Sequence, residues 1–140
     1  MMPSRVEPWT PPQGPDVTLL PAGRWWDAVR VPSSLGSRVL ARLGENSGAV
    51  IEDGFGAILY WLVWPGAADE WVLLQPSVSI CGATTYVAVP PVTYTEGPGL
   101  RWATPLSPTR YLTDPELLRA ALATEIDAVM GRRAGQGRAQ

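Results

Sequence analysis

Residues able to do chemistry gather in one short segment, GRWWDAVRV, at positions 23–31. Asp27 could hold a divalent cation or transfer a proton, and Arg30 could form a forked pair of hydrogen bonds with a phosphate. Trp25 and Trp26 offer ring faces on which a base could stack. The segment is therefore compatible with a metal-binding catalytic strand or with a surface that only binds.

The segment is typical of a β-strand, and strand alternation decides which of its side chains act together. Successive side chains point to opposite faces, so Arg30 shares a face with Trp26, and Asp27 lies on the other. We expect Arg30 and Trp26 to form a small phosphate-binding and stacking site for a nucleotide or a single strand. The alternatives are an Arg30 that pairs with an acid or lies over an indole, and an Asp27 that is a surface or edge-strand acid packed beside indoles.

The remaining acids form weaker groupings. Glu52 and Asp53 are adjacent, so a strand would point them to opposite faces, and Asp53 before a glycine is typical of a turn. Asp69 and Glu70 follow the sequence PGAA and are expected in a solvated loop. Together with Asp27 and a metal, these two acids would form the alternative of a minimal nucleotidyltransferase.

The composition excludes several kinds of catalytic site. The chain has no histidine and no lysine, and its one cysteine is Cys81. A Ser-His-Asp triad, a Cys-His pair, a zinc site containing histidine and a lysine Schiff base are therefore excluded. Neither GxxxxGK[ST] nor GxGxxG occurs, so the usual phosphate-binding loops are missing. We expect no cofactor and no metal, and we expect Cys81 to be buried and inert.

Length and charge set further bounds. A chain of 140 residues with 46% hydrophobic residues is expected to form one domain, and a net charge of −2 gives no general attraction to nucleic acid. The longest apolar run, residues 57–68, is too short to span a bilayer, and the N-terminus lacks the apolar core of a signal peptide. With a single cysteine, the sequence predicts a soluble cytoplasmic protein without membrane contact.

The predicted organisation has three parts. Residues 1–15 are proline-rich and predict a flexible arm, and residues 16–130 predict the folded domain. Residues 131–140 follow a helix-stopping glycine and predict a disordered basic tail. Arginines in that tail could add nonspecific phosphate contacts. These are Arg132, Arg133 and Arg138.

Hydrophobic periodicity predicts an α+β fold with two helices. The first helix spans residues 33–43, and the second follows TDPE at residues 113–116, where Thr113 and Glu116 would form a capping box. Two helices can cover only one face of the expected sheet. The strands are predicted at residues 17–20, 25–31, 49–52, 57–64, 71–74, 78–80, 84–89 and 100–103. The second helix would bury Leu118, Leu122, Ile126 and Val129, flanked by Leu117, Ala121 and Met130.

The strand AILYWLVW, at residues 57–64, is apolar on both of its faces. Tyr60 and Trp64 lie on one face and Trp61 on the other. Because helices cover one face only, either the sheet curls over on itself or the second face meets a partner. If the second face meets a partner, that partner could be a second copy of the chain bound through this tryptophan-rich face. The candidate interface residues are Tyr60, Trp61, Trp64 and Trp71.

Five motifs in order resemble the actinobacterial bifunctional DNA primase/polymerase N-terminal domain, of the archaeo-eukaryotic primase superfamily. The match covers roughly residues 17–104, and the family's N-terminal portion has no counterpart. The motifs are PAGRWWDAVRVP at 21–32, LARLG at 40–44, AILYWLVWPGAAD at 57–69, TYVAVPP at 85–91 and GPGLRW at 97–102.

The resemblance implies a sheet like that of RNA-recognition motifs, whose open face binds a nucleotide and two divalent metals. The family's paired acids align with Arg30 and Pro32, and its histidine falls within residues 56–60, where this chain has none. An arginine at an acid position disfavours Mg²⁺ and favours phosphate. The side chains that would hold the metals are therefore missing from the matched positions.

The sequence thus predicts a mostly antiparallel twisted sheet with two helices on one face, in a reduced primase-polymerase topology. The expected function is a non-catalytic binding or regulatory protein linked to replication or a mobile element. A minimal metal-dependent nucleotidyltransferase and a homodimeric interaction module without a nucleotide ligand are the alternatives. Nucleic acid is only a weakly supported partner because the net charge is negative.

Overall fold

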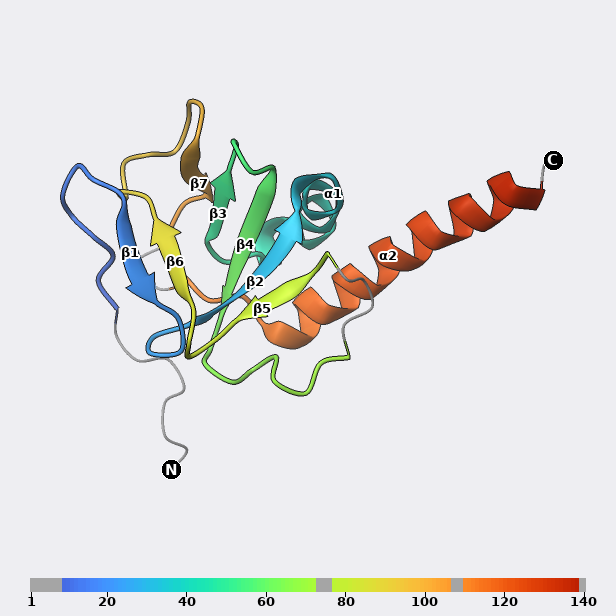
Figure 1. Ribbon diagram of the computed structural model, residues 1–140, viewed down its shortest axis with the longest axis horizontal. Coiled ribbons are helices and arrows are strands. Elements are labelled where there is room, and N and C mark those ends of the chain that lie inside the picture. Colours follow the sequence, from blue (N-terminus) through green and yellow to red (C-terminus); the bar gives the residue numbers. More distant parts are fainter. Residues whose placement is uncertain (1–8, 73–76, 107–109, 139–140) are drawn as a thin grey trace.

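The computed structural model describes residues 9–72, 77–106 and 110–138, with side chains described as far as Gly131 (Figure 1). The described part contains seven strands, two α-helices and one short 3₁₀ turn. In chain order these are β1 Thr18–Pro21, β2 Asp27–Pro32, α1 Ser33–Leu43, η1 Gly44–Asn46, β3 Val50–Asp53, β4 Ile58–Val63, β5 Ser79–Cys81, β6 Tyr86–Val89, β7 Leu100–Thr104 and α2 Pro115–Arg138.

The centre of the molecule is a five-stranded sheet in the order β5-β2-β4-β3-β7. Every neighbouring pair in it is antiparallel. Side chains of α1 and α2 pack on one face of this sheet, where they form a single apolar cluster with residues of β2, β3 and β4. The predicted α+β class, with a mostly antiparallel sheet and both helices on one face, is confirmed.

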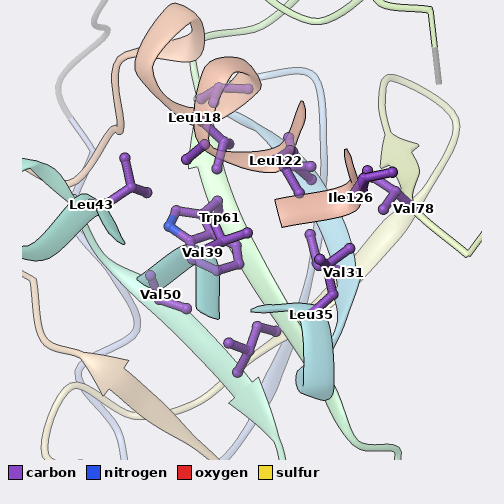
Figure 2. Close-up of a cluster of buried hydrophobic side chains, with 14 residues drawn as sticks. Val31, Leu35, Val39, Leu43, Val50, Trp61, Val78, Leu118, Leu122 and Ile126 are labelled. Atoms are coloured by element: carbon purple, nitrogen blue, oxygen red, sulfur yellow. The ribbon is translucent and has the colours of Figure 1, made fainter. Parts of the chain in front are cut away.

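Trp61 is the centre of that first cluster (Figure 2). Its ring is fully buried, and its Nε1 donates a hydrogen bond of 3.1 Å to Oγ of Ser47. In each helix, apolar residues recur every three or four positions and so form a stripe along one side. These two stripes pack over the Trp61 ring. The stripes are Leu35, Val39 and Leu43 of α1 and Leu118, Ala121, Leu122 and Ile126 of α2. Leu117 and Met130, expected beside the second stripe, are exposed.

The second face of the sheet is covered within the chain by a separate two-stranded ribbon. β1 and β6 pair antiparallel, with Leu20 opposite Val87 and Thr18 opposite Val89. Val87 and Val89 are buried in a second apolar cluster that includes Trp26 and Leu62 from the sheet. In Figure 1 the ribbon and the helices lie on opposite sides of the sheet. The molecule thus has three layers, and much of the face expected to be open is core.

The start of α2 corrects the predicted capping box. Asp114, not Thr113, caps the helix, because its Oδ1 accepts hydrogen bonds from the backbone N–H groups of Glu116 (2.8 Å) and Leu117 (3.2 Å). Thr113 is buried and joins the helix to the sheet instead. Its Oγ1 accepts a hydrogen bond from the N–H of Gly48, and its own N–H donates to the carbonyl of Leu62.

Two further predictions about elements are wrong. The helix α2 passes through Gly131, where a glycine lowers helix stability by only about 1 kcal/mol, and continues to Arg138. Residues 71 and 72 are not in a strand: they follow the turns at 65–70, and the N–H of Trp71 donates to the carbonyl of Ala68 and not to a neighbouring strand. The rest of the predicted strand, residues 73 and 74, lies outside the described residues. In the described part of the chain, no helix is both long enough and apolar enough to cross a membrane.

Candidate ligand-binding site

Asp27 lies at the start of β2 and is almost completely buried, with 3% of its surface exposed. It is neither a surface acid nor on an edge strand, because β2 lies between β4 and β5. Its Oδ2 accepts a hydrogen bond of 2.8 Å from the N–H of Gly66, whereas Oδ1 is buried without a described partner. Burial raises the pKa of Asp27, the Gly66 hydrogen bond opposes the rise, and Asp69 adds to it.

Trp26 is fully buried, which corrects its expected role as a stacking platform. Its ring meets that of Trp9 edge-on, with the ring centres 5.7 Å apart, and it belongs to the cluster beneath the ribbon. Its Nε1 has no described hydrogen-bond partner. A ligand could reach this indole only if the ribbon moved away. Trp26 and Arg30 therefore do not form a joint surface site in this structure.

Arg30 instead has Tyr60 and Ser79 as its neighbours across the strands. It is directly opposite Tyr60 of β4 and Ser79 of β5 in the two antiparallel ladders. Directly opposed residues point to the same face and lie about 5 Å apart at Cβ, so a guanidinium, a phenol and a hydroxyl form one row. Sequence reasoning gave Tyr60 only as an interface candidate and did not consider Ser79. The missing information was the strand register, which local patterns do not provide when the strands are far apart in sequence.

The row lies where the cover over the second face becomes incomplete. Ala28, Leu62 and Cys81, one step along the same strands, are buried beneath the ribbon. Arg30, Tyr60 and Ser79 are partly exposed, as are Pro32 and Ile58 in the next step of β2 and β4. Burial thus decreases along the strands from Ala28 towards Pro32. Solvent, and a ligand, can reach Arg30 from this side.

The guanidinium of Arg30 makes no ion pair, hydrogen bond or cation–π contact within the described chain. Other arginines differ: Arg101 pairs with Glu52 at 2.5 Å, and Arg24 lies over the ring of Trp25 at 4.7 Å. Neither structural alternative for Arg30, an acid partner or an indole beneath it, is found among the described residues. An unpaired guanidinium on a residue that is opposite a tyrosine in the sheet is suited to bind a phosphate-bearing ligand.

The other interface candidates are distributed over both faces of the sheet. Trp61 is buried under the helices and cannot contact a partner in this structure. Trp64 and Tyr60 are partly buried beside the cluster under the ribbon, and Trp71 is partly buried beside the helix-side cluster. These four aromatic residues therefore do not form one exposed face.

The acids are also dispersed. Asp53 is a turn former, as predicted, because its Oδ1 accepts hydrogen bonds from the N–H groups of Phe55 and Gly56, both at 3.0 Å. Asp69 and Glu70 are exposed in the loop after β4. Across the described residues, no three acidic or sulfur side chains come close enough to form a metal-binding group. Cys81 is buried, as expected, and burial raises the pKa of its thiol while Arg30 opposes the rise.

A shallow groove between α1 and α2 brings two arginines of the described residues together. It is lined by Arg38, Ala41, Arg42 and Glu125. The guanidinium of Arg42 already forms an ion pair with the carboxylate of Glu125 at 2.8 Å, so its charge is neutralised within the groove. This groove is therefore a less suitable anion site than the Arg30 row.

Comparisons with known proteins leave the chain without an assigned family. No family model matches the sequence, and no match is found among curated proteins or solved structures.

Proposed function

We propose that this protein is a non-catalytic binding module that holds a phosphate-bearing ligand, either a nucleotide or a single strand of nucleic acid, on the row Arg30, Tyr60 and Ser79. The observation that carries the proposal is Arg30, whose guanidinium has no described partner and which is directly opposite Tyr60 in the ladder at a partly open face. Arginine would bind the phosphate through a forked pair of hydrogen bonds.

The neighbours of Arg30 supply the rest of the recognition. The ring of Tyr60 would stack on a base, a contact worth about 1–3 kcal/mol per base and tolerant of base identity. The hydroxyl of Ser79 would donate one further hydrogen bond to a phosphate oxygen. This predicts affinity for the shared chemistry of phosphate and base, with little sequence preference. A role in replication or in a mobile element rests on the primase/polymerase resemblance alone and is part of the proposal.

The alternative of a metal-dependent nucleotidyltransferase has less support. Asp27 would need to share a metal with Asp69 or Glu70, but its carboxylate is buried on the strand face opposite Arg30. Its Oδ2 is already bound to the N–H of Gly66. A phosphate on Arg30 would therefore be separated from this carboxylate by the sheet.

The proposal is tested by titrating isotope-labelled protein with ATP, with a short oligothymidylate and with inorganic phosphate, while following amide and arginine side-chain resonances. We expect shifts centred on Arg30, Tyr60 and Ser79. Arg30→Gln should abolish binding, and Tyr60→Leu should weaken ATP and oligonucleotide more than phosphate, which offers nothing to stack.

Arg38→Gln is the matched control, since it removes the same charge from α1, on the other side of the sheet. If binding is attraction to net charge alone, both glutamine variants should weaken it equally, and the proposed site is then wrong. Unchanged resonances at Arg30 and Tyr60 in the presence of all three ligands would also contradict the proposal.

A further inference from the structure

The outer face of the β1–β6 ribbon is apolar and exposed. Leu19 and Tyr86, which point away from the core, are 67% and 66% exposed, and Val17, two residues before Leu19, is 47% exposed. The strands TLLP and YVAV contain no charged residue. Charges on edge strands commonly prevent association, and here they are absent from both strands of the ribbon.

The backbone of β1 also has an unpaired edge. The N–H of Ala22 donates to the carbonyl of Thr85, so every second residue back along β1, Leu20 and then Thr18, also points its backbone groups at β6. The N–H and C=O of Leu19 must therefore point the opposite way. No backbone group in the described part of the chain bonds to them. This edge is a template for another strand.

We propose that β1 pairs with β1 of a second copy of this chain, antiparallel and with Leu19 on the two-fold axis. The two strands would then join the two ribbons into one four-stranded sheet. In this register the two Leu19 residues exchange both N–H···O bonds, which satisfies the outward groups of each copy. The interface is the same patch on both copies, as a two-fold dimer requires.

Pro21 limits the pairing to this short register. Opposite Pro21 stands Val17 of the second copy, and proline has no N–H to donate, so the pairing ends after two residues on either side of Leu19. With Thr18 on the axis, Leu19 would instead pair with Val17 of the second copy, and with Leu20 on the axis it would pair with Pro21, which has no N–H to donate. The proposed register is the one that places the two exposed Leu19 side chains directly opposite each other across the axis.

The chemistry of the patch favours a second copy over a charged partner. An uncharged apolar strand has nothing to attract nucleic acid or a charged peptide, whereas it complements itself in shape and polarity. The net charge of −2 opposes association of two copies only weakly. Two paired five-residue segments, residues 17–21 of each copy, form a small interface compared with the 1,200–2,000 Å² typical of stable complexes, so we expect a weak dimer whose population depends on concentration.

The first test measures solution mass by sedimentation over a concentration series. The full chain should approach twice the monomer mass at high concentration, and Leu19→Glu should remain a monomer. Leu117→Glu, the same change at another exposed leucine on α2, should dimerise like the unchanged protein. A monomer at every concentration, or equal loss in both variants, would overturn the proposal.

The second test fixes the register. Hydrogen-bonded antiparallel partners have Cα atoms about 5.5 Å apart, which suits a disulfide. Under oxidised glutathione, Leu19→Cys should form a covalent dimer readily, because the two thiols are joined as the oxidant is reduced. Tyr86→Cys, on the same outer face but on β6, should form little. Equal crosslinking of the two variants would contradict pairing through β1. Neither test depends on the Arg30 site.

Discussion

The backbone N–H of Gly66 donates a 2.8 Å hydrogen bond to Oδ2 of Asp27, whose other oxygen, Oδ1, is buried without a described partner. Burial removes water from the carboxylate and so disfavours its charged form, which raises the pKa of Asp27 although the Gly66 hydrogen bond opposes the rise. Between the ordinary pKa of 3.8 and the raised one, the folded state therefore holds more protons than the unfolded state. The contribution of Asp27 to stability must fall as the pH rises through that window.

Asp27→Asn should therefore become more stable relative to the unchanged protein as the pH rises from below 3.8. Asparagine keeps an oxygen to accept the Gly66 hydrogen bond but does not ionise. Urea unfolding of both proteins at a series of pH values measures the difference between their free energies of unfolding. The contributions of the carboxyls that both proteins share cancel in that difference. Asp69→Asn, which removes only the smaller repulsion, should produce a smaller change of the same sign. A difference between Asp27→Asn and the unchanged protein that stays constant with pH would show that Asp27 has an ordinary pKa in the folded state.

Most of the helices, strands and turns could be predicted from the sequence, because each of them depends on residue spacing within a short segment of the chain. The buried stripe of α1, the turn at Asp53 and the alternation of Tyr60 and Trp61 across β4 all follow from spacing along the chain. The ribbon could not be predicted in the same way. β1 and β6 are separated by more than sixty residues, and nothing local shows that they pair with each other and cover the sheet.

The candidate site was only half predicted for the same reason. The chemistry of Arg30 marks it as a candidate, and alternation predicts Trp26 as its partner because Trp26 is close in sequence and on the same face. The fold buries Trp26 beneath the ribbon and brings Tyr60 and Ser79 beside Arg30 through the registers of β4 and β5. Which face is solvent-exposed is decided by packing of distant segments, and alternation alone cannot give it.

Trp61→Ala should be among the most destabilising single changes in the chain. The indole is fully buried between the helices and the sheet, so its loss leaves a large cavity and should lower the free energy of unfolding by roughly 3–5 kcal/mol. Trp61→Phe keeps most of the volume and loses the bond to Ser47, so it should cost less. Denaturant unfolding measures both. A small loss for Trp61→Ala would mean that the helices do not close over this face.

Asp114→Ala should destabilise α2 by about 1 kcal/mol, because two N–H groups of the first turn lose their acceptor. Thr113→Ala should cost about 1–3 kcal/mol, for a different reason: it leaves the buried N–H of Gly48 unpaired. Glu116→Ala separates this arrangement from a capping box. A capping box requires the Glu116 side chain. If Glu116→Ala lowers the free energy of unfolding as much as Asp114→Ala does, the capping box is the correct description of this helix start.

Arg30→Gln should leave the free energy of unfolding within about 0.5 kcal/mol of the unchanged protein, even though it is expected to abolish ligand binding. The guanidinium of Arg30 has no described partner, so its removal breaks no described hydrogen bond or ion pair that stabilises the fold. Arg42→Gln gives the contrast, since it removes the 2.8 Å bond to the mostly buried Glu125 and should cost about 1–3 kcal/mol. Urea unfolding of the two variants, run beside the ligand titration, separates binding from support of the fold. If Arg30→Gln is as destabilising as Arg42→Gln, Arg30 has a structural role, and its lost binding cannot be attributed to a ligand contact.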